Sequence, residues 1–189
     1  MTRSSSIPAR ALKVPIDGLD DVDWIDNKGL LELTDVPEHL VIVGGSYIGL
    51  EFGQIFRRFG SQVTIIEVAD QLLPREDSDI AGEAKDILTG EGITVATGAT
   101  IESVSQPGKN QVEVTFRDGD GSKTITGSHL LLAAGRVPNS DTLALDAAGV
   151  EADDRGYITV DGTTKTNVCL LYTSPSPRDA TLSRMPSSA

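Results

Sequence analysis

One apolar run that stops at two glycines constrains the possible folds of this chain more than any other stretch. Residues 41–51 read VIVGGSYIGLE. The apolar residues predict a buried strand over Leu40–Val43, with both faces covered as in a parallel sheet. After the glycines, Ile48, Phe52, Ile55, Phe56 and Phe59 fall on one stripe, which predicts a helix over Tyr47–Phe59.

The spacing of the small residues in this turn matches the pattern that dinucleotide-binding loops require. In a dinucleotide-binding βαβ unit, the first glycine permits the turn, the second admits the pyrophosphate, and the third brings helix and strand close. Gly44, Ser46 and Gly49 occupy those positions. Ser46 is either a small residue tolerated in a turn or a hydroxyl that donates to a phosphate oxygen. The strand and helix around the loop favour a dinucleotide site over an ordinary connection.

The next predicted strand, Gln62–Glu67, ends in an acid 18 residues after Gly49. An acid at this place accepts hydrogen bonds from the adenosine ribose, whereas a 2′-phosphate would meet like charge there. No lysine or arginine occurs from 68 to 74 to relieve that repulsion. We therefore expect NAD(H) rather than NADP(H), and Arg75 is the residue that could reverse this preference.

The remaining pattern predicts the fold class. A helix over Asp77–Glu91 and a strand over Ile93–Val95 continue the alternation, and short strands with turn residues between them follow. The predicted fold is α/β, a Rossmann-like three-layer NAD(P)-binding domain in which a β-meander replaces one crossover. The later strands are Thr100–Val104, Gln111–Phe116, Lys123–Thr126 and His129–Ala133.

Composition excludes several partners. The net charge is -12 and no basic stripe is present, so we expect no nucleic acid partner. No apolar stretch approaches the roughly 20 residues that span a bilayer. Because the N-terminus also lacks the apolar core of a signal peptide, we expect a cytoplasmic protein with no membrane contact. The single cysteine, Cys169, supports neither a disulfide nor a metal site.

Three segments resemble one family. VIVGGSYIGLEFGQIFRRFGSQVTIIE, LLPRED and LLLAAGRVPN are similar to the FAD-dependent pyridine nucleotide–disulfide oxidoreductases, which include dihydrolipoamide dehydrogenase and mercuric reductase. The resemblance runs from about Val14 to Val168. It implies that 38–135 is the NAD(P)-binding domain. Residues 1–37 would then connect it to a FAD domain outside the chain, and 136–168 would begin the return to that domain.

The resemblance also implies roles for individual residues. Tyr47 would cover the nicotinamide pocket, or else pack locally at the start of the helix. Glu51 would face the nicotinamide, or else complement the helix dipole. Both would support hydride transfer, and no catalytic residue is expected in this chain. Ile101 would contact the adenine side or belong to the core. The expected cofactor-binding residues are Gly44, Gly45, Ser46, Tyr47, Ile48, Gly49, Glu51, Glu67, Ile101 and Gly135.

Other parts of the family pattern have no counterpart here. The flavin-binding G-x-G-x-x-G, the redox-active C-x-x-x-x-C and the interface domain with its His-Glu pair are missing, and neither His39 nor His129 is assigned a catalytic role. We expect the NAD(H)-binding portion of a homodimeric flavoprotein that passes hydride from NAD(P)H to FAD and on to a disulfide or related acceptor. FAD belongs to the intact parent only, and the fragment alone would be inactive. The alternatives are a stand-alone NAD-binding module without redox chemistry and a chain that binds nothing stably.

The last residues depart from the family. Residues 169–189 read CLLYTSPSPRDATLSRMPSSA, which resembles a translated sequencing-library adapter with a variable index at Ala180–Leu182. We interpret this segment as a non-native, adapter-derived tail that is excluded from fold reasoning. The alternative is a natural tail rich in serine and proline.

Overall fold

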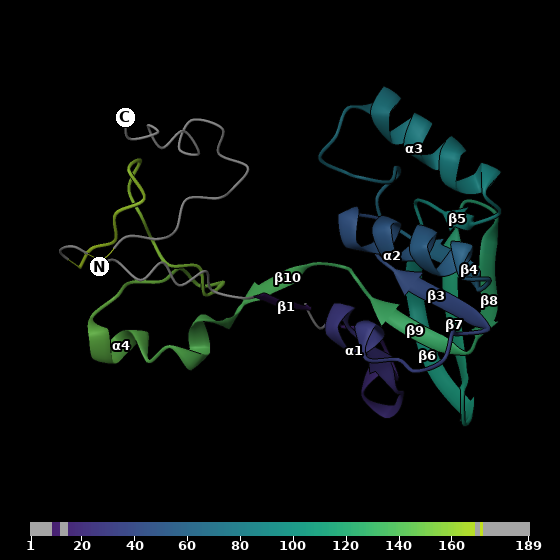
Figure 1. Ribbon diagram of the computed structural model, residues 1–189, viewed down its shortest axis with the longest axis horizontal. Coiled ribbons are helices and arrows are strands. Elements are labelled where there is room, and N and C mark those ends of the chain that lie inside the picture. The colour runs from purple at the N-terminus through teal and green to yellow at the C-terminus, as the bar shows by residue number, and fades with distance from the viewer. Residues whose placement is uncertain (1–8, 12–14, 169–170, 172–189) are drawn as a thin grey trace, which may run out of the picture. The chain divides into compact units, whose positions relative to one another are not determined.

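The computed structural model describes residues 9–11, 15–168 and 171 (Figure 1). Two compact units divide the chain: one is Ala11–Arg136, and the other joins Met1–Arg10 with Val137–Ala189. The first unit therefore begins well before residue 38, where the sequence places the start of the NAD(P)-binding domain. The adapter-like interpretation of 169–189 falls, except for residue 171, outside the described residues.

A five-stranded parallel sheet forms the centre of the Ala11–Arg136 unit. Its strand order is β2-β9-β3-β4-β5, and each neighbouring pair is parallel. In the middle strand the register pairs Leu40 with Val63 on one side and with His129 on the other. The strands are β2 (Trp24–Ile25), β3 (His39–Val43), β4 (Gln62–Ile66), β5 (Thr94–Ala96) and β9 (His129–Leu132).

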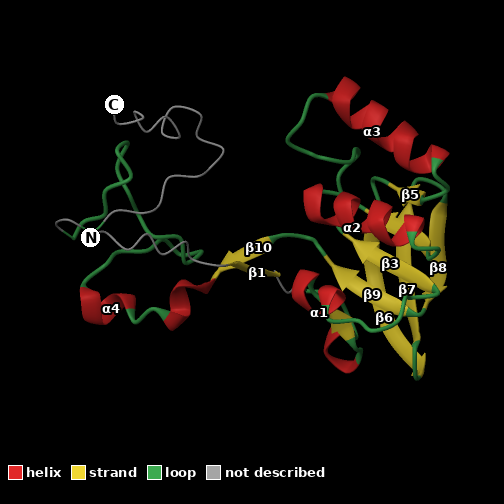
Figure 2. Ribbon diagram, viewed as in Figure 1, coloured by secondary structure: helices red, strands yellow, loops and turns green. Residues whose placement is uncertain are grey.

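Helices cover one face of this sheet, where α2 (Tyr47–Arg58) and α3 (Ser78–Gly90) lie together (Figure 2). Phe56 and Leu88 from these helices pack with alternate strand residues, such as Ile42 and Ile65, in one buried cluster. A short helix, α1 (Asn27–Leu31), begins where the Asp26 carboxylate accepts from the backbone N–H groups of Lys28 and Gly29.

An antiparallel meander packs against the other face. It consists of β6 (Thr100–Gly108), β7 (Gln111–Asp118) and β8 (Gly121–Gly127) in consecutive order. Val114 and Phe116 are buried with Val41 and Val43, the strand residues that alternate with those facing the helices. Helices, parallel sheet and meander thus form three layers, and the predicted Rossmann-like fold with a β-meander is confirmed.

Two local predictions differ from the structure. On α2 the buried residues are Gly49, Gly53 and Phe56, while Ile55 and Phe59 are 42% and 63% exposed, so the predicted apolar stripe is partly wrong. The sequence also missed β2, a strand of only two residues at the sheet edge. Short elements of this kind carry too few residues to show a period.

The described part of the second unit contains little regular structure. It includes β10 (Arg136–Pro138), whose Arg136 belongs to the first unit, a 3-10 turn over Asn139–Thr142, and α4 (Leu145–Ala148). β10 pairs with β1 (Ala9–Ala11) in a two-stranded sheet. Further along, an isolated bridge pairs Ala152 with Ile158.

Candidate functional site: the glycine loop between β3 and α2

The loop after β3 depends on glycine at its first position. Gly44 has a φ of 112°, a backbone conformation that residues with a side chain rarely adopt. A Cβ at Gly44 would also lie 2.6 Å from the carbonyl carbon and oxygen of Ala133. The Gly44 N–H donates to the Ile66 carbonyl at 2.9 Å. The turn therefore lies tightly against the ends of β4 and β9.

Gly49 brings the helix close to the strand. A Cβ at Gly49 would lie 2.0 Å from the Gly44 carbonyl oxygen, a distance that backbone atoms cannot accommodate. One turn later, a Cβ at Gly53 would lie 3.2 Å from Cδ1 of Ile65. The first turn of α2 can consequently approach the loop only because position 49 carries no side chain. This is the role that the fingerprint assigns to its third glycine.

Ser46 is the N-cap of α2, and its backbone is extended with φ -95° and ψ -174°. Its carbonyl accepts from the Leu50 N–H at 3.0 Å, but its side chain makes no capping hydrogen bond. The N–H groups in the first turn of a helix lack intrahelical partners and favour an anion. Ser46 is half-buried, and both interpretations of this residue stay predictions.

Glu67 follows β4 directly and is only 7% exposed. One carboxylate oxygen accepts from the Gly45 N–H at 2.5 Å, and the other accepts from the Ala69 N–H at 2.8 Å. The predicted ribose-binding acid therefore also supports the glycine loop from beneath. Sequence reasoning missed this second role, because the pattern placed Glu67 on the next strand without showing where its side chain points.

The segment 68–77, which we call the strap, continues from Glu67 and lies against the same loop. Leu72 is fully buried, and a Cβ at Gly45 would lie 2.6 Å from its Cδ2 atom. The Leu73 N–H donates to the Gly45 carbonyl at 2.8 Å. The Gly45 N–H thus donates to the Glu67 side chain, and the Gly45 carbonyl accepts from the strap. Both bonds support this part of the loop. No feature of the sequence indicated these contacts.

The remaining predicted residues divide into two groups. Tyr47 and Glu51 are exposed on the first turns of α2, and the Tyr47 hydroxyl donates to the Glu76 carboxylate of the strap. Gly135 is exposed beyond β9, with a φ of 139°. By contrast, Ile48 and Ile101 are half-buried against the two core clusters. Both side chains therefore contribute to the core, and their roles toward a cofactor stay predictions.

The two histidines lie at the opposite ends of strands β3 and β9 from the glycine loop. His39 Nε2 lies 3.0 Å from Thr64 Oγ1, and His129 Nδ1 lies 3.1 Å from Ser128 Oγ. Burial lowers the pKa of both rings below 6.5, while a backbone hydrogen bond at Thr126 and the charge of Glu38 raise the pKa of His39 and oppose this effect. The His39 contact joins β3 to β4, whereas the His129 contact is local.

These histidines should make the fold acid-sensitive. A ring with a lowered pKa binds fewer protons folded than unfolded, so stability is complete above the unfolded pKa of 6.5. We expect the free energy of unfolding to fall as pH drops from 6.5 through the folded pKa values. Urea denaturation across this range measures the slope. The variant His39→Gln should show a shallower slope, and an unchanged slope would contradict the assignment.

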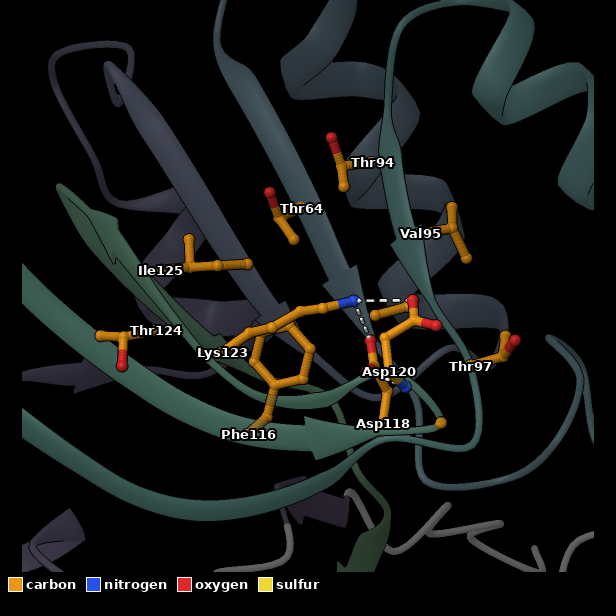
Figure 3. Close-up of a pocket in the computed structure, with 12 residues that line it drawn as sticks. Thr64, Thr94, Val95, Thr97, Phe116, Asp118, Asp120, Lys123, Thr124 and Ile125 are labelled. Carbon is orange, nitrogen blue, oxygen red and sulfur yellow. Dashed lines mark hydrogen bonds and ion pairs between the residues drawn. The ribbon is translucent and has the colours of Figure 1, made fainter.

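A separate pocket of about 590 Å³ lies between β4, β5 and the β7–β8 hairpin (Figure 3). Lys123 Nζ reaches Asp118 at 2.7 Å and Asp120 at 3.1 Å, and the first of these contacts lowers the pKa of Asp118. Threonine hydroxyls contribute most of the other polar groups. None of the predicted cofactor-binding residues lines this pocket. The tight turn and the N-terminus of α2 coincide instead at the glycine loop, which is the candidate site.

Among the described residues, no helix is long and apolar enough to cross a membrane. The same residues contain no group of three or more histidine, cysteine, aspartate or glutamate side chains placed to hold a metal ion.

Comparison with known proteins gives a consistent result. A family model described as pyridine nucleotide-disulphide oxidoreductase matches residues 7–174. Mercuric reductase of Bacillus cereus is 41% identical over 162 residues, covering 84% of this chain and 25% of that protein. Dihydrolipoyl dehydrogenase of Bacillus subtilis is 40% identical over 170 residues, covering 89% of this chain and 35% of that protein.

A solved structure shows the same similarity. The HOCl-induced flavoprotein disulfide reductase RclA from Escherichia coli superposes with a TM-score of 0.78 at 36% identity, covering 89% of this chain and 38% of that one. Across these three proteins, the chain spans between 25% and 38% of the relative's length.

Proposed function

Because the chain belongs to the pyridine nucleotide-disulphide oxidoreductase family, we propose that its glycine loop binds NADH for a flavoprotein oxidoreductase. NADH held there would supply a hydride, and FAD in such a protein would supply the redox chemistry toward a disulfide or related acceptor. The FAD, the acceptor site, the interface domain and a homodimeric assembly belong to the remaining length of such a protein. The fragment alone is proposed to bind nucleotide without turnover.

One observation carries this proposal: the glycine loop provides a cradle that side chains would fill. Added Cβ atoms at Gly44 and Gly49 would meet backbone atoms at 2.6 Å and 2.0 Å. The loop opens directly into α2, a helix of 12 residues whose N-terminus favours an anion. A pyrophosphate fits this combination of close backbone approach and a helix N-terminus. Ser46 and the backbone of Ile48 would complete the site, and Gly45, whose N–H donates to Glu67, would support it.

The charge around Glu67 supports NADH over NADPH. Its carboxylate is buried and points to the loop, so a 2′-phosphate on the adenosine ribose would bring a second anion beside it. Val68 follows it and is 70% exposed, and the next basic residue, Arg75, lies in the exposed part of the strap. A ribose with free hydroxyls can instead donate to the remaining lone pairs of Glu67.

A second candidate is a stand-alone NAD-binding module. The compactness of Ala11–Arg136, with its own buried clusters on both sides of the sheet, favours this alternative. Flavin content separates the two for the purified chain. Visible flavin absorbance would contradict the proposal that FAD is bound only by the larger protein.

Calorimetry with NADH and NADPH tests the nucleotide preference. We expect NADH to bind at least about tenfold more tightly, which corresponds to about 1.4 kcal/mol. The like-charge contact at Glu67 is the reason. Equal affinities would overturn the role of Glu67, and no binding of either nucleotide would overturn the proposed function. If ADP-ribose, which lacks nicotinamide, also binds, the main contribution to the binding free energy comes from contacts at the loop.

A further inference from the structure

We propose that the pocket beneath the β7–β8 hairpin is a second ligand site, which takes a small uncharged compound built like a nucleoside: a flat ring with hydrogen-bonding groups on two sides. Its volume of about 590 Å³ lies within the range of small-molecule sites. The pocket shares no residue with the glycine loop, with Glu67 or with the strap. The inference therefore goes beyond the proposed function and does not depend on it.

Short side chains on the parallel sheet leave this pocket open. Thr64 lies two residues before Ile66, which is buried on the meander side, so both side chains share that face. The register partner of Thr64 on β5 is Thr94. Where Val41 and Ile66 fill the space between the two layers, the shorter threonines leave it open toward the sheet edge. The pocket is thus a slot between two β layers, a shape that suits a flat ligand.

The facing layer supplies apolar walls. Val114 and Phe116 of β7 are buried toward the parallel sheet, and their register partners on β8 are Ile125 and Lys123. Residues directly opposite each other in a ladder share a face, so Ile125 and Lys123 also lie on the pocket side. In Figure 3 the lysine side chain passes the Phe116 ring before it reaches the hairpin tip. Phe116, Ile125 and the lysine stem therefore offer apolar surface to a ring.

Two separate sets of hydrogen-bonding groups reach the pocket. The hydroxyls of Thr64 and Thr94 come from the sheet. Thr64 Oγ1 lies 3.0 Å from Nε2 of His39, and a hydroxyl that makes one hydrogen bond can still make another. The Lys123 ammonium comes from the hairpin tip, and it has three N–H groups for its two carboxylate partners. A ligand can therefore hydrogen-bond to the threonines on one side and to the lysine on another.

The charge at the hairpin tip selects against anions. Lys123 Nζ lies 2.7 Å from Asp118 and 3.1 Å from Asp120, so one positive charge is shared by two negative ones. The Asp118 carboxylate also accepts from the Asp120 N–H at 3.0 Å, which holds it in place. A phosphate or carboxylate on a ligand would meet the excess negative charge, in a chain whose net charge is -12. An uncharged ligand avoids this repulsion and keeps the hydrogen bonds.

Nuclear magnetic resonance titration of the full 189-residue chain with adenosine tests the inference. We expect adenosine to shift the signals of Thr64, Thr94 and Ile125, with a dissociation constant of about 1 mM or lower. Adenosine 5′-monophosphate should bind there at least about threefold more weakly, because its phosphate is repelled. Adenosine that leaves these signals unshifted, or equal affinities for the two compounds, would overturn the inference.

Two variants and a matched control identify the groups responsible. Thr94→Val keeps the side-chain shape and removes one hydroxyl, so it should weaken adenosine binding by about threefold to tenfold. Thr100→Val makes the same change at an exposed strand position outside the pocket and should leave the affinity unchanged. Asp120→Ser removes the excess charge from a side chain that is 85% exposed, so adenosine 5′-monophosphate should then bind about as tightly as adenosine. Equal losses for the two threonine variants, or continued rejection of the phosphate by Asp120→Ser, would contradict the assignment.

Adenosine is also part of NADH, so a further measurement separates the pocket from the glycine loop. The signals of Gly45 and Glu67 report the loop, and excess ADP-ribose is added to occupy it. Adenosine should still shift Thr94 under these conditions. Adenosine shifts confined to Gly45 and Glu67, and lost with ADP-ribose, would overturn the inference and support the proposed function. If neither ADP-ribose nor NADH binds while adenosine shifts Thr94, the proposed function fails and the inference stands.

Discussion

Alanine at position 49 is expected to destabilise the Ala11–Arg136 unit by at least about 2 kcal/mol and to abolish measurable NADH binding. The new Cβ would lie 2.0 Å from the Gly44 carbonyl oxygen, so α2 would have to move away from the turn. The obstacle is backbone rather than the end of a flexible side chain, and a small rotamer change cannot relieve it. Urea denaturation measures the loss of stability, and calorimetry measures the loss of affinity.

Gly82→Ala is the matched control for this prediction. Gly82 lies in α3, and a Cβ there would meet no atom within 4 Å. Alanine is the better helix former by about 1 kcal/mol, so this variant should be as stable as the wild type or slightly more stable. It should also bind NADH normally. Equal stability for Gly49→Ala and Gly82→Ala would show that the loop tolerates a side chain, contrary to the close packing described above.

Alanine at position 67 is expected to cost about 1–3 kcal/mol of stability and to weaken NADH binding by at least about tenfold. The substitution removes both acceptors of the N–H groups of Gly45 and Ala69, and Gly45 is buried. The same change removes the negative charge that disfavours NADPH. The ratio of NADPH to NADH affinity should therefore rise, which separates this effect from a general loss of the loop.

Two further variants define how Glu67 acts. Glu67→Gln keeps one acceptor but turns an NH₂ group toward one of the two N–H donors, so its stability should fall between those of alanine and wild type. Glu83→Gln, on the exposed side of α3, should change stability by less than about 0.5 kcal/mol. If Glu67→Ala keeps full stability and affinity, the carboxylate does not support the loop.

The elements that the sequence predicted well are those whose signal is local. The apolar run of β3, the turn glycines and the start of α2 each lie within a few consecutive residues, and all three form as expected. The exposed side of α2 was predicted less well. Gly49 and Gly53 bring this helix against the sheet, so the buried face centres on Gly49, Gly53 and Phe56. Ile55 and Phe59 consequently turn outward.

In the candidate site, too, features with a local sequence signal were predicted and features without one were not. The glycine spacing and the acid after β4 could be predicted, because the topology of a βαβ unit brings them to one edge of the sheet. The strap could not be predicted from its residue pattern. Its path depends on a leucine with positive φ and on packing beneath Gly45, neither of which leaves a periodic signal. The hydrogen bond between Tyr47 and Glu76 follows from that path.

The pairing of β1 with β10 has a consequence for how such a unit can be accommodated in a longer polypeptide. These strands lie where the chain enters and leaves Ala11–Arg136, so the two ends of the unit are held side by side. A host domain interrupted at this point would keep its own two flanks adjacent, and little loop-closure entropy would be lost in joining them. A host fold could therefore carry this unit between two of its own neighbouring residues without being stretched.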